Sequence, residues 1–182
     1  MAVPAPGAAS PEPPSSSRRQ ALTFAAASLA LWVNPARALD APTGTVVLTV
    51  QGRVRMPNDG KRAQFDMAML EALPQRTLQT KTPWYAQARR FTGPLLRDVL
   101  AAAGAQGSNL RLVALNDYQV DMPMEDPMRH DVVVARLMDD KPMTVRDKGP
   151  LFIIYPFDAQ AELRSAIYYG RSAWQLRTIE VL

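Results

Sequence analysis

An apolar run near the N-terminus constrains the fold most, because it separates a leader from the part of the chain that can form a core. Ala21 to Val33 follows two arginines and precedes Ala36-Arg37-Ala38. The run is shorter than the roughly 20 apolar residues of a membrane-spanning helix, and the small-x-small pattern is typical of a signal-peptidase site. We therefore expect residues 1–38 to be a disordered, Pro/Ala/Ser-rich start plus a signal peptide, with an uncleaved anchor as the lesser alternative. A signal peptide implies export to the periplasm, by the Sec or the twin-arginine route. We expect residues 39–182 to fold as one domain.

The residue types that are missing restrict the chemistry of the chain. The sequence has no cysteine and one histidine, His130. The lack of cysteine excludes disulfides, zinc–thiolate sites, iron–sulfur clusters and thiol nucleophiles, and a single histidine excludes a two-histidine metal site. Because no partner surrounds His130 at a ligand spacing, we expect it at the surface. The net charge is +4, and the sequence has no block of five like charges, so nothing favours nucleic-acid binding.

Short β-branched or alternating stretches predict most of the strands. Val132–Val134 fits either a strand or a short helix, and both remain open. The predicted strands are Thr45–Val50, Arg76–Thr80, Leu110–Leu115, Tyr118–Met122, Leu151–Tyr155 and Trp174–Val181.

Capping signals predict the helices. Asp66 is expected to be the N-cap of a short helix that ends at Pro74. Pro94 is expected at the first position of the clearest helix, which Gly104 would end. Ala159–Ile167 fits a helical turn. Many short strands with few short helices predict the α+β class.

Four segments in order carry a resemblance to a known family. They read FTGPLLRDVLAAAGA, ALNDYQVDMP, KGPLFIIYPFD and GRSAWQLRTIEV. Together they resemble the molybdopterin-binding domain of the sulfite-oxidase family over about residues 44–182. The resemblance implies a sulfite-oxidase-type fold, with mixed sheets and a few short helices.

The chain departs from the enzymes of that family at two positions. In those enzymes a cysteine thiolate binds molybdenum shortly before the Gly-x-x-Leu helix, and Thr80 stands nearest to that place. A threonine hydroxyl has a pKa far above the thiol value of about 8.5, so it cannot supply the soft, charged ligand. Ala173 stands where those enzymes have a lysine that helps hold the cofactor phosphate. We therefore expect no metal and no redox turnover.

The resemblance is strongest to small exported pterin-binding regulators that lack this cysteine. It implies a periplasmic, non-catalytic protein that binds a pterin and signals the ligand state to a membrane-bound partner. Two alternatives remain open at this point. One is a molybdopterin-dependent oxidoreductase or a subunit of one, with the metal held by non-thiolate groups. The other is a structural adaptor that binds no ligand and has a filled cleft.

A pteridine needs aromatic faces for stacking and a carboxylate for its amino-pyrimidinone edge. Trp84, in a loop with Tyr85 before the Pro94 helix, and Trp174 are the aromatic candidates. Tyr118 and Tyr155 are further candidates at strand ends. Asp117, in the turn after Asn116, is the carboxylate candidate.

Arginines are candidates for the ligand's carbonyl, ring nitrogens or phosphate. Arg171-Ser172 falls where the family has an Arg-Ser pair that helps bind the phosphate, and Arg90, beside Arg89, is a weaker candidate. Glu125-Asp126 is expected to be a pair of solvated loop residues, with one of them as a possible pterin carboxylate. Asp139-Asp140 is expected to be a turn and nothing more.

Overall fold

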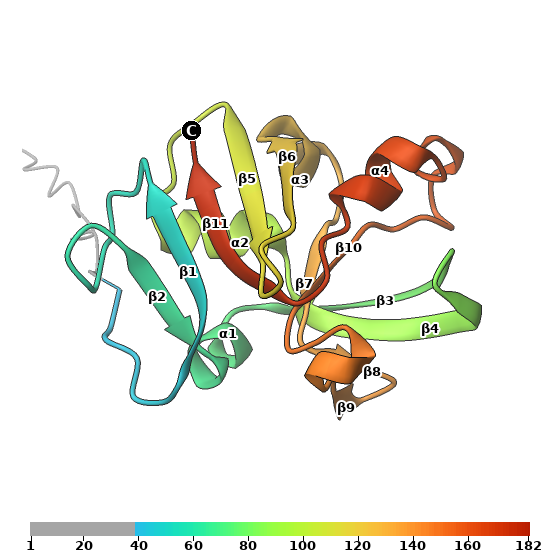
Figure 1. Ribbon diagram of the computed structural model, residues 1–182, viewed down its shortest axis with the longest axis horizontal. Coiled ribbons are helices and arrows are strands. Elements are labelled where there is room, and N and C mark those ends of the chain that lie inside the picture. Colours follow the sequence, from blue (N-terminus) through green and yellow to red (C-terminus); the bar gives the residue numbers. More distant parts are fainter. Residues whose placement is uncertain (1–38) are drawn as a thin grey trace, which may run out of the picture. The chain divides into compact units, whose positions relative to one another are not determined.

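Residues 39–182, which the computed structural model describes, form three β-sheets and a set of short helices (Figure 1). The leader predicted over residues 1–38 lies outside the described residues. The α+β class, with mixed sheets and few short helices, is confirmed. No helix within residues 39–182 is both long and apolar enough to cross a membrane.

The largest sheet has five strands in the order β2-β1-β11-β5-β6. Its closing strand, β11, pairs in parallel with β1 on one side and antiparallel with β5 on the other. The strands β1, β5, β6 and β11 were predicted to within one or two residues at each end. The largest shift at a strand start is in β11, which begins at Leu176 and not at Trp174. The bounds are β1 Val46–Gly52, β2 Ala63–Asp66, β5 Asn109–Ala114, β6 Gln119–Pro123 and β11 Leu176–Val181.

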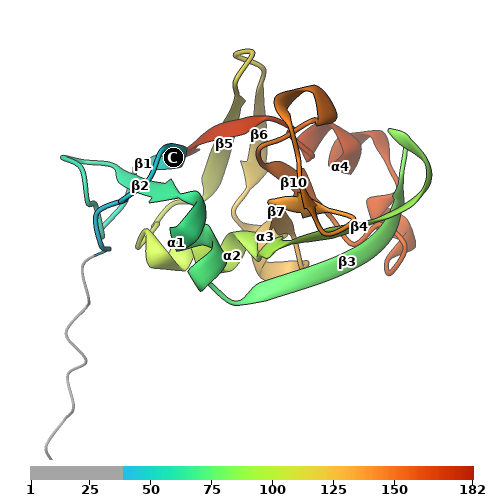
Figure 2. The same cartoon turned by 90° about the horizontal axis from the view of Figure 1, so that it is seen from below.

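The second sheet is built on a long hairpin of β3 (Gln75–Thr82) and β4 (Tyr85–Pro94). The short strands β8 (Leu137–Met138) and β9 (Lys141–Pro142) extend it beyond β4. A separate pair, β7 (Val133–Ala135) and β10 (Phe152–Ile154), lies beside β4 (Figure 2). The segment around Val133 is therefore a strand, which settles the open choice.

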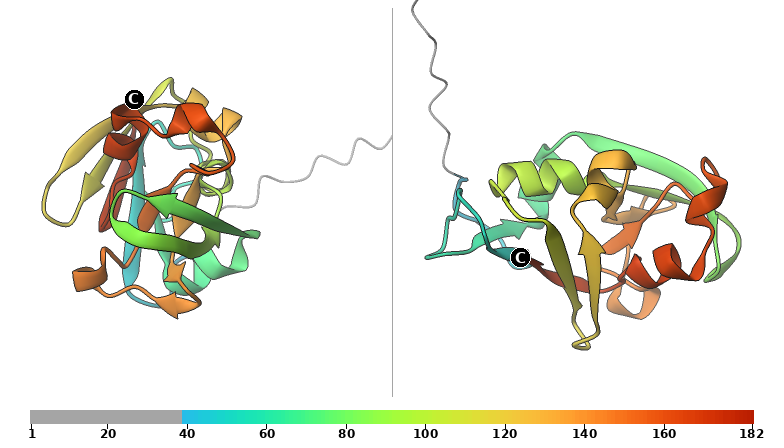
Figure 3. Two further views of the ribbon diagram at one scale, coloured as in Figure 1. Left: turned by 90° about the vertical axis from the view of Figure 1, so that its right-hand side faces the viewer. Right: turned by 90° about the horizontal axis from the view of Figure 1, so that it is seen from above.

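The helices are all short. They are α1 Met67–Ala72, α2 Leu96–Ala102, α3 Glu125–Arg129 and α4 Ala166–Arg171, with 3-10 turns η1 Val145–Asp147 and η2 Ala161–Leu163. The Asp66 cap is confirmed, because its carboxylate accepts a 2.8 Å bond from the Met69 backbone N–H. Gly104 follows α2 in the left-handed region (φ 63°), as expected of a residue that ends a helix. The α4 helix lies beside β6 (Figure 3).

The prediction that Pro94 begins a helix is wrong. Pro94 is the last residue of β4, opposite Gln75, and α2 begins at Leu96. Leu95 is extended because it bridges to Val133, and the Leu96 N–H donates to the Val132 carbonyl at 2.8 Å. Pairing between distant segments thus overrides the local preference of proline for the first helical turn.

The loop predicted around Trp84 and Tyr85 is also wrong in form. Thr82 pairs with Tyr85, so only Pro83 and Trp84 make the hairpin turn, and Tyr85 already belongs to β4. Trp84 packs against both hydrophobic clusters of the described residues, one around the five-stranded sheet and one around Phe91. The hairpin therefore carries an aromatic ring to the junction of the two clusters.

Candidate functional site

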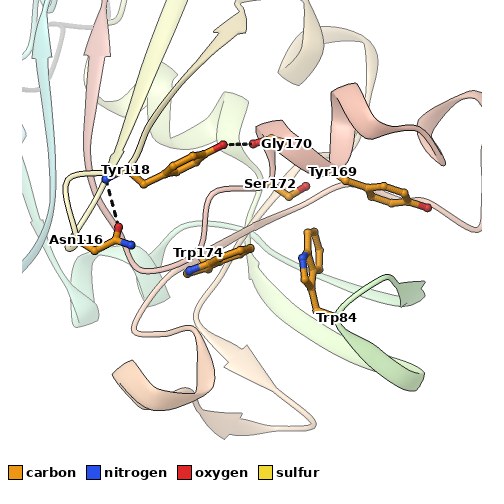
Figure 4. Close-up of a pocket in the computed structure, with 7 residues that line it drawn as sticks. All are labelled: Trp84, Asn116, Tyr118, Tyr169, Gly170, Ser172 and Trp174. Atoms are coloured by element: carbon orange, nitrogen blue, oxygen red, sulfur yellow. Dashed lines mark hydrogen bonds between the residues drawn. The ribbon is translucent and has the colours of Figure 1, made fainter.

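A cavity of about 240 Å³ opens where the turns of two hairpins meet α4 (Figure 4). The β3–β4 turn contributes Trp84, and the β5–β6 turn contributes an asparagine and a tyrosine. The α4 helix, its C-terminal cap and the residues before β11 complete the lining. The lining residues are Trp84, Asn116, Tyr118, Tyr169, Gly170, Ser172 and Trp174.

Three aromatic rings form the apolar wall of this pocket. The Trp84 ring lies 5.9 Å from Trp174 at 76° and 6.1 Å from Tyr169 at 77°, both edge-to-face arrangements that aromatic pairs favour. Trp84 also packs against Phe152 at 5.2 Å, which fixes its position. A rigid wall of crossed rings can present a flat face to a planar heterocycle without first having to be ordered.

The β5–β6 turn places the polar part of the pocket. Asp117 has a positive φ of 62°, a conformation that Asn and Asp adopt more readily than most residues. The Tyr118 backbone N–H donates to Asn116 Oδ1 at 3.2 Å. The Tyr118 hydroxyl then donates to the Gly170 carbonyl at 3.2 Å, which ties the turn to α4 (Figure 4).

Two polar side chains of the lining keep bonding capacity for a ligand. The Asn116 amide nitrogen has no hydrogen-bond acceptor among the described residues, because only its oxygen is used. The Ser172 hydroxyl donates to the Tyr168 carbonyl at 2.9 Å and keeps its lone pairs. The pocket thus offers an aromatic face, a free amide donor and a hydroxyl acceptor, which suits a flat heterocycle with polar edges.

Four of the residues predicted from the sequence line this pocket, namely Trp84, Tyr118, Ser172 and Trp174. Asn116 was expected only as a turn residue, and neither Tyr169 nor Gly170 was predicted to lie at a binding site. The adjacent aromatic pair Tyr168-Tyr169 before Gly170 was the signal that could have identified this wall.

The charged candidates lie outside the lining and are paired with other charges. The Asp117 carboxylate pairs with Arg177 at 3.0 Å, and 79% of the Asp117 side chain is exposed. Arg90 pairs with Asp140, which lies in the turn between β8 and β9. Its neighbour Arg89 pairs with Asp139 at 2.7 Å. The expectation that Asp139-Asp140 is a turn and nothing more is therefore wrong, since both carboxylates also pair with arginines of β4.

Asp126 is buried, against the expectation of a solvated loop residue. One oxygen, Oδ2, accepts a 2.7 Å bond from the Tyr155 hydroxyl and a 2.8 Å bond from the Arg171 guanidinium. The side chain of Asp126 is 9% exposed and that of Arg171 is 21% exposed. Tyr155 is fully buried, and this burial, reinforced by the bond to Asp126, raises the pKa of its hydroxyl. This network connects α3, the end of β10 and the last residue of α4.

His130 is also buried, at 5% exposure, so the prediction of a surface residue is wrong. Its ring packs against Tyr155 at 6.4 Å and Tyr168 at 5.9 Å, and its Nδ1 has no hydrogen-bond partner among the described residues. The ring closes one side of the Asp126 network. Sequence spacing could not show this, because the packing partners come from distant segments.

The residues present do not fit a molybdenum cofactor. Thr80 is 1% exposed, and its hydroxyl accepts a 3.1 Å bond from the Asp158 backbone N–H. It therefore connects β3 to the segment after β10 and does not line the pocket. Residues 39–182 contain no group of three or more His, Cys, Asp and Glu side chains that could hold a metal. Arg171, the phosphate candidate, is paired with Asp126.

Comparison with known families gives one match. The family model of the oxidoreductase molybdopterin binding domain matches residues 39–161, which confirms the family and the sulfite-oxidase-type fold expected from the sequence. No curated protein matches the chain. Trp84, Asn116 and Tyr118 lie within the matched residues, whereas the α4 side of the pocket and Trp174 lie beyond them.

Proposed function

This chain belongs to the family of oxidoreductase molybdopterin binding domains, and from that premise we propose that it is a non-catalytic protein that binds a pterin or a similar flat heterocycle. We further propose that it acts in the periplasm and transmits its ligand state to a membrane-bound partner. The family relation supports a pterin-type ligand, and the chemistry of the pocket supports binding without catalysis.

One observation carries the proposal: Thr80, which the family resemblance places nearest to the position of the metal-binding cysteine, is buried and does not line the open aromatic pocket. The Thr80 hydroxyl accepts a hydrogen bond from the Asp158 backbone N–H, so this position provides no metal ligand. The pocket nearby keeps a cavity of about 240 Å³ between Trp84, Trp174 and their neighbours. A site that loses its metal ligand and keeps an aromatic cavity is suited to bind a ring rather than to change its oxidation state.

The two alternatives make different claims about the same pocket. An oxidoreductase would need a non-thiolate group to hold the metal, and the hydroxyl of Thr80 is buried and accepts a bond from the Asp158 backbone N–H. An adaptor with a closed cleft would need side chains to fill the cavity. The open volume favours a binding protein over an adaptor.

A signalling role requires the bound and free forms to present different surfaces. The α4 helix is the element of the pocket best suited to change, because none of its residues is buried and two of them line the cavity. Hydrogen exchange in α4 should slow when ligand binds. Equal exchange with and without ligand would contradict this part of the proposal.

The test of the ligand is made on protein purified from the periplasm of its native host. We expect the denatured protein to release a fluorescent pterin, and mass spectrometry to detect no stoichiometric molybdenum. Asn116→Ala should lower the pterin occupancy, because it removes the free amide of the lining.

The adjacent residue provides the matched control. Asp117→Asn removes the charge of an exposed carboxylate that pairs with Arg177 and keeps a residue type that tolerates the positive φ of this turn, so it should leave the occupancy unchanged. Stoichiometric molybdenum would return the protein to the oxidoreductases. Protein that carries neither pterin nor metal, and takes up no pterin when it is added, would favour the adaptor.

A further inference from the structure

We propose that the free edge of β3 binds an extended, acidic segment of a partner protein, which adds to the second sheet as one more strand. The free edge is the outward-facing backbone of residues 75–79, on the outside of the β3–β4 hairpin (Figure 2). This surface is distinct from the aromatic pocket, and binding there does not depend on the ligand of that pocket.

The backbone groups of Thr77 and Gln79 point away from β4. These residues stand opposite Thr92 and Arg90, whose carbonyls accept backbone bonds from the residues that flank β8. In an antiparallel pair, residues directly opposite each other exchange both backbone bonds or neither. The N–H and carbonyl groups of Thr77 and Gln79 therefore face outward. Within residues 39–182 no bond is made to these backbone groups, and both residues are exposed.

The next outward N–H along β3 shows what this edge accepts. The Lys81 N–H donates to the Asp158 carboxylate at 2.8 Å, so an acidic side chain from a distant segment already covers one donor of the edge. Edge strands are usually blocked by proline, by irregular pairing or by a covering segment. Pro74 lies before the free edge, and the register is irregular after it, between Thr80 and Thr82. The stretch between these blocks stays open to a further strand.

A cavity of about 310 Å³ lies beside the free edge. Arg76 and Leu78 of β3 line one side of it, and the rest of the lining comes from α3, the residue two positions after it and the segment around Asp158. Side chains that stand opposite each other on neighbouring strands point to the same face of a sheet. The two residues of an added strand that stand opposite Arg76 and Leu78 therefore enter this cavity.

The charges around the cavity favour an acidic partner. Asp131 is shared by Arg76 at 3.3 Å and Arg97 at 2.8 Å, and the Arg76 side chain is 57% exposed. Arg129, also in the lining, pairs with the exposed Glu125 at 3.1 Å. Three arginines thus face two carboxylates, so a further carboxylate is attracted here and a lysine is repelled. A second copy of this chain would bring the same excess of arginine and is the less suitable occupant.

The test measures the binding of two fluorescent heptapeptides to the exported protein by fluorescence anisotropy. Both peptides are rich in threonine, and both carry a valine two positions before a charged residue. Antiparallel addition opposite Leu78 and Arg76 requires this order. The charged residue is glutamate in one peptide and lysine in the other. We expect the glutamate peptide to bind about fivefold more tightly, because an exposed attraction replaces an exposed repulsion.

Variants of the edge separate the backbone contact from the charge. Gln79→Pro removes an outward N–H that is not bonded within residues 39–182, and should weaken binding at least about tenfold. Gln79→Thr is the matched control, because it keeps the N–H, and should leave the affinity unchanged. Arg76→Gln should reduce the preference for glutamate to less than about twofold. Arg62→Gln, at a similarly exposed arginine that pairs with Asp59, should leave this preference intact.

The proposal is overturned if neither peptide binds, if both bind equally, or if Gln79→Pro binds as tightly as wild-type protein. A dimer in sedimentation that Gln79→Pro dissociates would also overturn it, because the edge would then bind a second copy. If Gln79→Pro does not fold, hydrogen exchange in wild-type protein decides. The Thr77 and Gln79 amides should exchange more slowly with the glutamate peptide, and unchanged exchange overturns the proposal. None of these measurements uses the aromatic pocket, so the proposed function stands or fails separately.

Discussion

Replacement of Asp126 by alanine should destabilise the protein far more than the same change at the adjacent Glu125. Asp126→Ala removes the acceptor of a 2.7 Å bond from Tyr155, whose hydroxyl is buried and has no route to water. An unsatisfied buried hydroxyl costs about 1–3 kcal/mol. The change also removes the partner of Arg171, which is 21% exposed and can recover part of its hydration. Breaking a buried ion pair on one side costs about 3–5 kcal/mol, and we expect the free energy of unfolding to fall by that amount.

The neighbouring pair provides the comparison on the same helix. Glu125 and Arg129 bond at 3.1 Å, but their side chains are 67% and 64% exposed. Exposed pairs of this spacing contribute about 0.3–0.5 kcal/mol, so Glu125→Ala should be nearly neutral. Urea unfolding followed by tryptophan fluorescence measures both changes. Equal losses at the two positions would refute the argument that burial, and not charge pairing as such, makes the Asp126 network stabilising.

The assay also has an internal check through the bonded partner. Tyr155→Phe keeps the ring and removes only the hydroxyl that donates to Asp126. It should cost about 1.5–3 kcal/mol, the usual contribution of a hydrogen bond to a charged group. In the Asp126→Ala background the same change should cost much less, because the bond is already absent. Additive losses would show that the two residues act independently.

Three further changes test separate parts of the fold. Asp66 accepts three backbone N–H bonds that lower the pKa of its carboxyl group. The stabilising contribution of this carboxylate is therefore complete above its ordinary pKa and is lost as pH falls through the lowered pKa. Asp66→Asn should therefore flatten the fall in melting temperature from about pH 5 to about pH 2.5. Gly93→Ala should destabilise by about 3 kcal/mol in urea unfolding, because a Cβ would clash with the Val134 carbonyl oxygen. Gly170→Ala, where nothing lies within 4 Å, is its control and should stabilise the protein by about 0.5–1 kcal/mol. Tyr118→Phe removes the bond to α4 and should change stability by less than about 1 kcal/mol while it speeds hydrogen exchange in α4; unchanged exchange would show that this bond does not hold the helix.

The candidate site was predictable from the sequence where aromatic residues stand next to turn signals. Trp84 and Trp174 were expected to contact a ligand because of their ring chemistry, and Tyr118 because it follows the Asn-Asp turn. All three line the pocket. The charged candidates were chosen by residue type and by their place in a turn or in the family pattern, and neither shows which charges are paired. The partner of Asp117, Arg177, is 60 residues away in the sequence, and the partner of Arg171, Asp126, is 45 residues away.

Burial explains the errors at His130 and Asp126. Polar residues are mostly exposed, so both were expected at the surface. The structure buries them because α3 lies against Tyr155 at the end of β10 and Tyr168 in α4. Nothing in the local sequence shows this packing, since a buried charge becomes acceptable only when a partner arrives from another segment.

The amino-acid sequence alone established the α+β class, the Asp66 cap, most of the strands and the lack of a thiolate for molybdenum. These properties depend on residue type and on local periodicity, which a sequence displays directly. The position of Pro94 in a strand, the assembly of the pocket from two hairpin turns and α4, and the pairing of Arg171 with Asp126 depended on contacts between distant residues. Such contacts form only when the whole chain buries its apolar surface, so they follow from the tertiary packing and not from any segment by itself.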